Sequence, residues 1–163
     1  MKKIIIINIL LFLSSCSINH KILSNDKYTT KLVNTIFKEH GNAFSVSSTY
    51  YTFSTVWFYT SDKIKIYHLN NGKILEKYEF SSQNFLNEVP VKEVFEVNGC
   101  MEFDGDGFIY KVNLNNMIYE DELPINLNCF LEKKYKSKFL NRIVSDIKEF
   151  QIMKYFPSPA APE

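Results

Sequence analysis

The chain has 163 residues, and its 19 basic and 18 acidic side chains give a net charge of +1 at pH 7. That balance provides no bulk attraction for nucleic acid, so charge-driven nucleic-acid binding is excluded. The 45% hydrophobic content, with 14 Phe and 10 Tyr against five Gly and five Pro, excludes a disordered chain. Arg142 is the one arginine, which disfavours bidentate recognition of phosphate.

The first sixteen residues have a pattern of their own. Lys2 and Lys3 provide a positive start, and an apolar run follows over Ile4–Leu13. Leu13-Ser14-Ser15-Cys16 ends the segment. The apolar run is about ten residues long, whereas a membrane-spanning helix needs about 20. An ordinary cleaved secretory signal and an apolar first strand are alternative interpretations.

This order of charge, apolar run, small residues and cysteine resembles the lipobox signal of bacterial lipoproteins. The resemblance implies that the chain is cut before Cys16, whose thiol is acylated with palmitate-type chains. Membrane lipid is then a partner of the protein through acylated Cys16, because several acyl chains on one residue anchor a protein stably. The implied location is the bacterial cell envelope, at the outer membrane rather than the inner, with the domain facing the periplasm or the exterior.

Four segments are predicted along the chain. Residues 1–15 form the signal peptide, and residues 16–26 form the lipidated cysteine with a short tether. Residues 27–156 form a single α+β domain, and residues 157–163 form a proline-rich tail. The tether reaches about 35 Å when fully extended, so the domain is expected to sit against the membrane.

The first predicted element of the domain is a helix over Tyr28–His40. Its apolar residues recur with a period of 3.6, at Tyr28, Leu32, Val33, Ile36 and Phe37. Asn25 or Asp26 can cap the start of this helix, and Gly41 offers a left-handed stop.

A strand is predicted next, over Tyr50–Thr60, because its residues alternate between two faces. One face carries Tyr51, Phe53, Trp57 and Tyr59. These side chains can pack beneath a helix, or they can form an aromatic binding face for sugar or peptide.

Two hairpins are predicted from whether the apolar residues of their strands fall at even or at odd sequence positions. Lys63–Leu69 and Lys73–Phe80 flank Asn70-Asn71-Gly72, and matching even positions with even positions requires a three-residue loop with left-handed Gly72. Asp104-Gly105-Asp106-Gly107 is predicted to form the second tip, with Gly105-Asp106 as a two-residue loop and Phe103 opposite Phe108.

Near the C-terminus, an amphipathic helix is predicted over residues 131–150, with Asn128 and Ser137 both plausible as its N-cap. The predicted fold class is therefore α+β: an N-terminal helix, an antiparallel β-meander of about five to seven strands, and a C-terminal amphipathic helix packed on one sheet face. Helices lie only at the ends of the chain, which favours segregated layers over βαβ alternation.

Cysteines and histidines give no metal or cofactor site. Once Cys16 is acylated, Cys100 and Cys129 remain, and an exported pair favours a disulfide, with two buried free thiols as the alternative. The three histidines lack metal-ligand spacing. Asp104 and Asp106 could offer carboxylates to Ca²⁺, but Asp and Gly are also what a tight turn requires.

Charge is distributed unevenly. The segment from Glu88 to Glu122 has nine acidic residues and two basic ones, Lys92 and Lys111. The segment from Leu131 to Lys154 has seven basic and three acidic residues. Solvated faces explain most such patterns. The sharper interpretation is a basic helix that faces lipid or a protein partner, with an acidic hairpin turned away.

No catalytic set is apparent in the sequence. We therefore expect a membrane-anchored, non-enzymatic binding domain with a protein partner in the envelope, either an immunity-type lipoprotein that neutralises a toxin or an accessory subunit of an envelope complex. The alternative is an envelope hydrolase with a dispersed carboxylate pair drawn from Glu76, Glu102 and Asp106.

Overall fold

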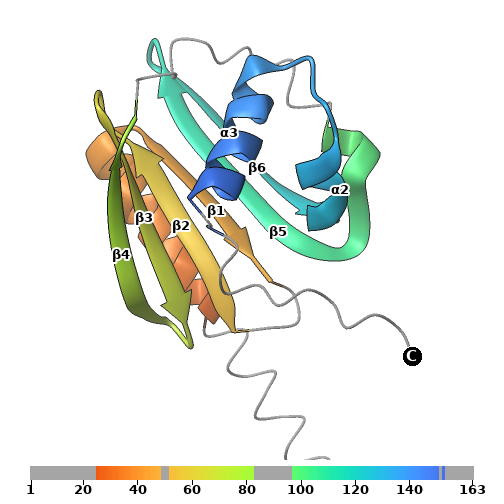
Figure 1. Cartoon of the computed structure of the whole chain (residues 1–163). Coiled ribbons are helices and arrows are strands. Elements are labelled where there is room, and N and C mark those ends of the chain that lie inside the picture. The colour runs from red at the N-terminus through yellow and green to blue at the C-terminus, as the bar shows by residue number, and fades with distance from the viewer. Residues whose placement is uncertain (1–24, 49–51, 83–96, 151, 153–163) are drawn as a thin grey trace, which may run out of the picture.

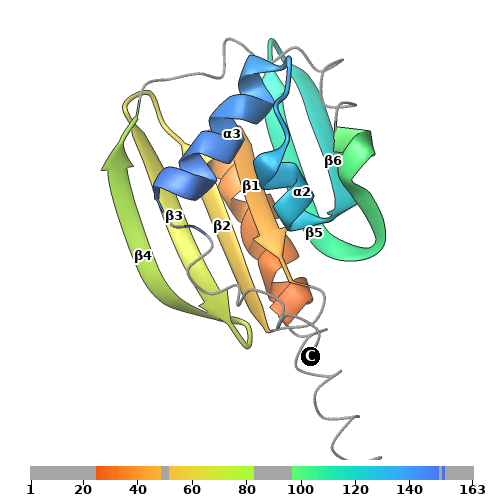
Figure 2. The same ribbon diagram turned by 45° about the vertical axis from the view of Figure 1, so that its right-hand side comes forward.

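Six antiparallel strands form one sheet with helices on both faces (Figure 1). The computed structural model describes residues 25–48, 52–82, 97–150 and 152. The strands are β1 (Asn42–Ser47), β2 (Phe53–Tyr59), β3 (Lys63–Asn70), β4 (Lys73–Ser81), β5 (Met101–Leu114) and β6 (Met117–Ile125). The N-terminal helix (residues 25–40) covers one face, and α2 (Leu127–Glu132) and α3 (Lys138–Glu149) lie on the other (Figure 2). The predicted α+β class is confirmed.

The strand order is β4-β3-β2-β1-β5-β6. The first four strands follow one another as a meander, but β5 returns to the opposite side and pairs with β1, with Ser45 opposite Ile109. β1 therefore lies in the middle of the sheet, where both of its faces are covered. Phe44 and Val46 belong to the core on the α3 side, and Ala43 belongs to the core beneath the N-terminal helix.

The N-terminal helix is present as predicted, but the predicted capping residues are wrong. Asn25 and Asp26 are themselves helical. The buried Asn25 side chain instead joins the helix to the sheet: its amide donates to Ser54 Oγ at 3.3 Å and its oxygen accepts from Gly72 N–H at 3.0 Å. The predicted stop is confirmed, since Gly41 has φ of +73° and its N–H donates to the Phe37 carbonyl at 2.8 Å.

The β3–β4 hairpin corrects the predicted three-residue loop. Asn71 and Gly72, with φ of 50° and 71°, form a two-residue turn. A β-bulge then changes the register, from Leu69 opposite Ile74 to His68 opposite Glu76. The extra residue restores the predicted even-with-even pairing. It also moves Ile74 to the face of the N-terminal helix, away from the face of Tyr78.

The predicted hairpin tip at residues 104–107 is wrong. These residues lie within β5, and the β5–β6 turn is Asn115-Asn116, with φ of 52° and 64°. Asparagine tolerates left-handed backbone, so this pair serves a two-residue turn as Asn-Gly does. Met101 and Asp106 both pair with Ile125, so the residues between them bulge out of the ladder. Phe103 is consequently 97% exposed instead of lying opposite Phe108.

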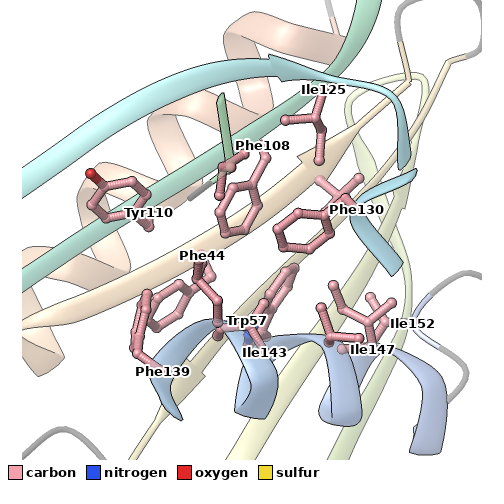
Figure 3. Close-up of a cluster of buried hydrophobic side chains, with 14 of the residues drawn as sticks. Phe44, Trp57, Phe108, Tyr110, Ile125, Phe130, Phe139, Ile143, Ile147 and Ile152 are labelled. Atoms are coloured by element: carbon pink, nitrogen blue, oxygen red, sulfur yellow. The ribbon is translucent and has the colours of Figure 1, made fainter. Parts of the chain in front are cut away.

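The single predicted C-terminal helix is two helices. Asn126 caps α2 by accepting from Cys129 N–H, and Ser137 caps α3 by accepting from Leu140 N–H. Ser137 is thus confirmed as an N-cap, whereas Asn128 lies inside α2. The apolar stripe of α3 packs on the sheet (Figure 3), where Phe139, Ile143 and Ile147 point toward aromatic side chains of the strands. Burying each such side chain contributes about 1.5–3 kcal/mol.

A polar cluster joins α3 to the sheet inside this core. The Tyr59 hydroxyl donates to Asp146, which is 2% exposed, and Arg142 Nε donates to both carboxylate oxygens of Asp146 at 3.0 Å. Arg142 also donates to Ser82 Oγ, beyond the end of β4. Burial raises the pKa of Asp146, although Tyr59 and Arg142 act in the opposite direction. Burial and the nearby Asp146 charge hold the pKa of Tyr59 well above its usual value.

Replacing Tyr59→Phe is expected to lower the free energy of unfolding by about 1–3 kcal/mol, because the buried Asp146 carboxylate loses a donor. Urea unfolding of the purified protein measures this change. Tyr110→Phe is the matched control, since Tyr110 is also buried and its hydroxyl has no hydrogen bond within the described part of the chain. Equal losses in the two variants would show that ring packing, and not the bond to Asp146, carries the effect.

Candidate functional site

The predicted aromatic binding face is not an open surface. Trp57 and Tyr59 are buried under α3, in the main core cluster, so the binding-face interpretation is wrong for these two residues. Phe53 is half-buried at the start of β2, and Tyr51 lies outside the described residues. The alternation of β2 itself is as predicted, because Val56 and Phe58 belong to the core on the other face.

The cysteines occupy two different situations. Cys16, the predicted lipidation site, lies outside the described residues. Cys100 and Cys129 are joined in a disulfide, with Cα atoms 5.5 Å apart. Cys100 belongs to a short 3₁₀ turn (residues 97–100) beside α2, not to a strand. On the chain-entropy account, closing a loop with a sequence separation of 29 stabilises the fold by roughly 3.5 kcal/mol.

The described histidines have structural partners. The His40 ring stacks on Phe58 with centroids 4.1 Å apart. His68 is buried, and its Nδ1 lies 2.9 Å from the Thr55 hydroxyl, which donates to the Ile152 carbonyl. His20 lies outside the described residues. Across residues 25–48, 52–82, 97–150 and 152, no three His, Cys, Asp or Glu side chains are placed to hold a metal ion together.

The carboxylates considered for a hydrolase do not all meet. Glu76 accepts a hydrogen bond from Tyr78 on β4, at one edge of the sheet. Glu102 accepts from Asn126 at 2.9 Å and lies on β5, as does Asp106. β3, β2 and β1 separate β4 from β5, so Glu76 cannot share a reaction centre with the other two.

A concave surface lies elsewhere, between the N-terminal helix and the β5–β6 arm of the sheet. The core under this helix takes residues from β1, β2 and β3, and the helix leaves much of β5 and β6 uncovered on that side. Two cavities of about 340 and 310 Å³ adjoin there and share Thr30, Ile109 and Glu122. We call this surface the acidic groove; the charged side chains on this face of the sheet and on the helix are Asp26, Lys111, Glu120 and Glu122.

Carboxylates dominate the electrostatics of the acidic groove. Burial, and then the charge of Glu122, raise the pKa of Asp26 above its usual 3.8. Lys111 is the one cation among the lining residues, and it is already committed to an ion pair with Glu120 and to a hydrogen bond with Asn34 at 3.3 Å. Ser47 and Ser48 line the same cavity as Asp26. The groove is therefore suited to binding cationic groups that bring hydrogen-bond donors.

The sequence indicates the acidic residues of β6 but not which other residues lie beside them. The acidic excess up to Glu122 was visible, and the structure places its end on β6. Asp26 is 96 positions away in the chain, and its sequence context predicts a helix cap instead. Only the packing of the N-terminal helix against the sheet brings Asp26 and Glu122 to the same cavity, and no local spacing encodes that proximity.

Comparisons with known proteins do not assign a family. No family model matches the chain, and no solved structure matches it. The chain is 28% identical over 128 residues to a protein named "Probable potassium transport system protein Kup" from Methanosarcina acetivorans. The match covers 74% of this chain but 21% of that protein, so the chain spans about a fifth of its length. Within the residues that the structure describes, no helix has both the length and the apolar character needed to cross a bilayer.

Replacing Asp26→Asn is expected to stabilise the domain at neutral pH. Because the pKa of Asp26 is raised on folding, the stability contribution of this group is fully present below pH 3.8 and is lost as the pH rises through the folded-state pKa. The amide cannot ionise, so the stability of the variant relative to the parent should increase between pH 3 and pH 7. Thermal unfolding across that range measures the difference, and the exposed Asp104→Asn gives the background effect of removing a carboxylate. A difference that does not change with pH would contradict the interpretation.

Proposed function

We propose that this chain is a lipid-anchored, non-enzymatic interaction domain of the bacterial cell envelope, and that it binds a protein partner through the acidic groove. The observation that carries this proposal is the groove itself: an open, carboxylate-lined surface in which Asp26 and Glu122 are held together. Two neighbouring carboxylates cost free energy until a cation approaches them. A partner with basic side chains would remove that cost on binding.

The position of the groove fits an anchored protein. Asp26 is the second described residue of the N-terminal helix, and Cys16 precedes that helix by nine residues, which span at most about 30 Å. A partner in the groove would therefore be held close to the bilayer. An immunity-type lipoprotein that neutralises a toxin and an accessory subunit of an envelope complex both use such placement.

The anchor is tested by Cys16→Ser. We expect this variant to leave the membrane fraction, because one lipidated cysteine supplies the membrane affinity of a chain whose net charge is close to zero. Membrane and soluble fractions of cells that make each form are compared by immunoblot after a salt wash. A serine variant that still pellets with washed membranes would contradict the lipoprotein assignment.

The groove is tested by site-specific photo-cross-linking in cells of the source organism. Thr30 is exposed and lines both cavities, so a photoreactive residue in its place should cross-link a defined envelope protein. Lys148, exposed on α3 on the opposite face of the sheet, is the matched control position. Mass spectrometry identifies the products. The same products from both positions, or none from Thr30, would argue against a partner at the groove.

A second candidate is an envelope hydrolase that uses Asp26 and Glu122. The observation in its favour is that Asp26 combines a raised pKa with a neighbouring carboxylate, as an acid–base pair requires. Turnover of envelope glycans or esters that Asp26→Asn and Glu122→Gln both abolish would favour this candidate over the binding domain. The similarity to a potassium transport protein covers about a fifth of that protein and brings no transport activity to this chain.

A further inference from the structure

Within the described part of the chain, β6 is the last strand of the sheet, with β5 on its inner side. At the C-terminal end of β6 the outer side is already used, because Met101 also pairs with Ile125 and Asn126 N–H donates to the Cys100 carbonyl at 2.8 Å. The Asn115-Asn116 turn fixes which backbone groups of β6 point outward. In a two-residue hairpin the residues next to the turn, Leu114 and Met117, exchange both hydrogen bonds, and such pairs then recur at every second position. The N–H and C=O groups of Ile118, Glu120 and Glu122 therefore point away from β5.

Three observations support this assignment. Asn113 N–H donates to the Gly41 carbonyl at 2.7 Å, on the side of β1, so its neighbours Val112 and Leu114 face β6. Glu122 N–H donates to the Asp121 side chain at 2.9 Å and not to β5. Pro124, which has no N–H, also falls on an outward position, so the ladder with the main part of β5 loses no donor there.

The side chains of the outward residues continue into the acidic groove. Leu123 and Ile125 belong to the core on the α3 side, so the even-numbered residues of β6 lie on the side of the N-terminal helix. Glu120, Glu122 and Pro124 accordingly line the groove cavities. Ile118 is 57% exposed and gives the same edge an apolar end near the turn.

We propose that a partner protein docks by adding a strand to β6, with lysine or arginine at alternate positions directed into the acidic groove. This inference rests on the proposed function and specifies its partner. The backbone groups of Ile118 and Glu120 and the carbonyl of Glu122 would supply the pairing, and Glu120, Glu122 and Asp26 would select basic side chains. The strand would run beside β6 and would extend the sheet from six strands to seven.

Charge excludes a second copy of this chain as the occupant. Antiparallel pairing of two β6 strands would set the Glu120-Asp121-Glu122 segments of both copies against each other. Like charges directly opposite each other destabilise a strand pair, and charged residues on edge strands are a known protection against self-association. A basic strand reverses the sign of this term, so the same residues that reject a copy favour such a partner.

The experiment titrates the isotope-labelled mature domain with a nine-residue peptide that alternates lysine with valine or threonine. Amide resonances of Ile118 and Glu120 should shift, and binding should weaken with salt. Three peptides serve as controls. One has glutamate in place of lysine. The other two are N-methylated, each along a different edge of the strand, which keeps the charge but blocks pairing through that edge.

Two variants at one position separate pairing from charge. Glu120→Ala removes the carboxylate, and Glu120→Pro also removes an outward N–H that β5 does not use. We expect Glu120→Pro to bind the lysine peptide about tenfold more weakly than Glu120→Ala, with both variants folded by circular dichroism. Equal affinities, undiminished binding of the N-methylated peptides, or no binding at millimolar peptide would each overturn strand addition.

The two proposals fail in distinguishable ways. If Thr30 cross-links a partner while the peptides do not pair with β6, the interaction domain stands and strand addition is wrong. If the peptides pair as expected while Thr30 cross-links nothing in cells, strand addition is a property of the edge, and the proposed envelope partner is wrong.

Discussion

The pairing of β5 with β1 is the constraint on which the rest of the structure depends. β1 is short, and it is the one strand that joins the β2–β3–β4 meander to the β5–β6 arm. Six register pairs, from Asn42–Val112 to Ser47–Gly107, fix the arm in place. This pairing brings Phe108 and Tyr110 beneath α2 and α3 and sets Ile109 beside the N-terminal helix. Without it, neither the main core nor the acidic groove would exist.

The two faces of the sheet are covered to different extents, and this asymmetry creates the candidate site. On one face, α2 and α3 pack over a continuous apolar cluster with buried residues from β1, β2, β3, β5 and β6, against which Tyr78 and Phe80 of β4 pack partly buried. On the other face, the N-terminal helix packs mainly over β1, β2 and β3. The uncovered part of β5 and β6 is largely polar apart from the exposed Ile118, as an antiparallel sheet permits when one face meets solvent. The acidic groove is the boundary between the covered and uncovered parts.

Much of the fold could be predicted because its signals are local. The 3.6-residue period of the N-terminal helix, the stop at Gly41 and the cap at Ser137 each depend on a few consecutive residues. The hairpins show where local reasoning fails. Parity correctly matched His68, Ile66 and Ile64 with even residues of β4, but a β-bulge supplied the extra residue that a longer turn had been expected to supply. In β5, the Asp-Gly pairs satisfied the rules for a turn, yet Asn115-Asn116 took that role.

The sequence by itself determined the α+β class, the alternation of β2 and the acidic excess that ends at Glu122, because periodicity and composition act over short stretches of chain. The tertiary structure alone decided that β5 returns to β1, that Trp57 and Tyr59 are core residues, and that Asp26 meets Glu122. Each of these depends on which surfaces bury one another across tens of residues, and an edge strand is defined by what does not pair with it. Which strand pairs with which is decided by all the strands together, and no single segment of the chain specifies it.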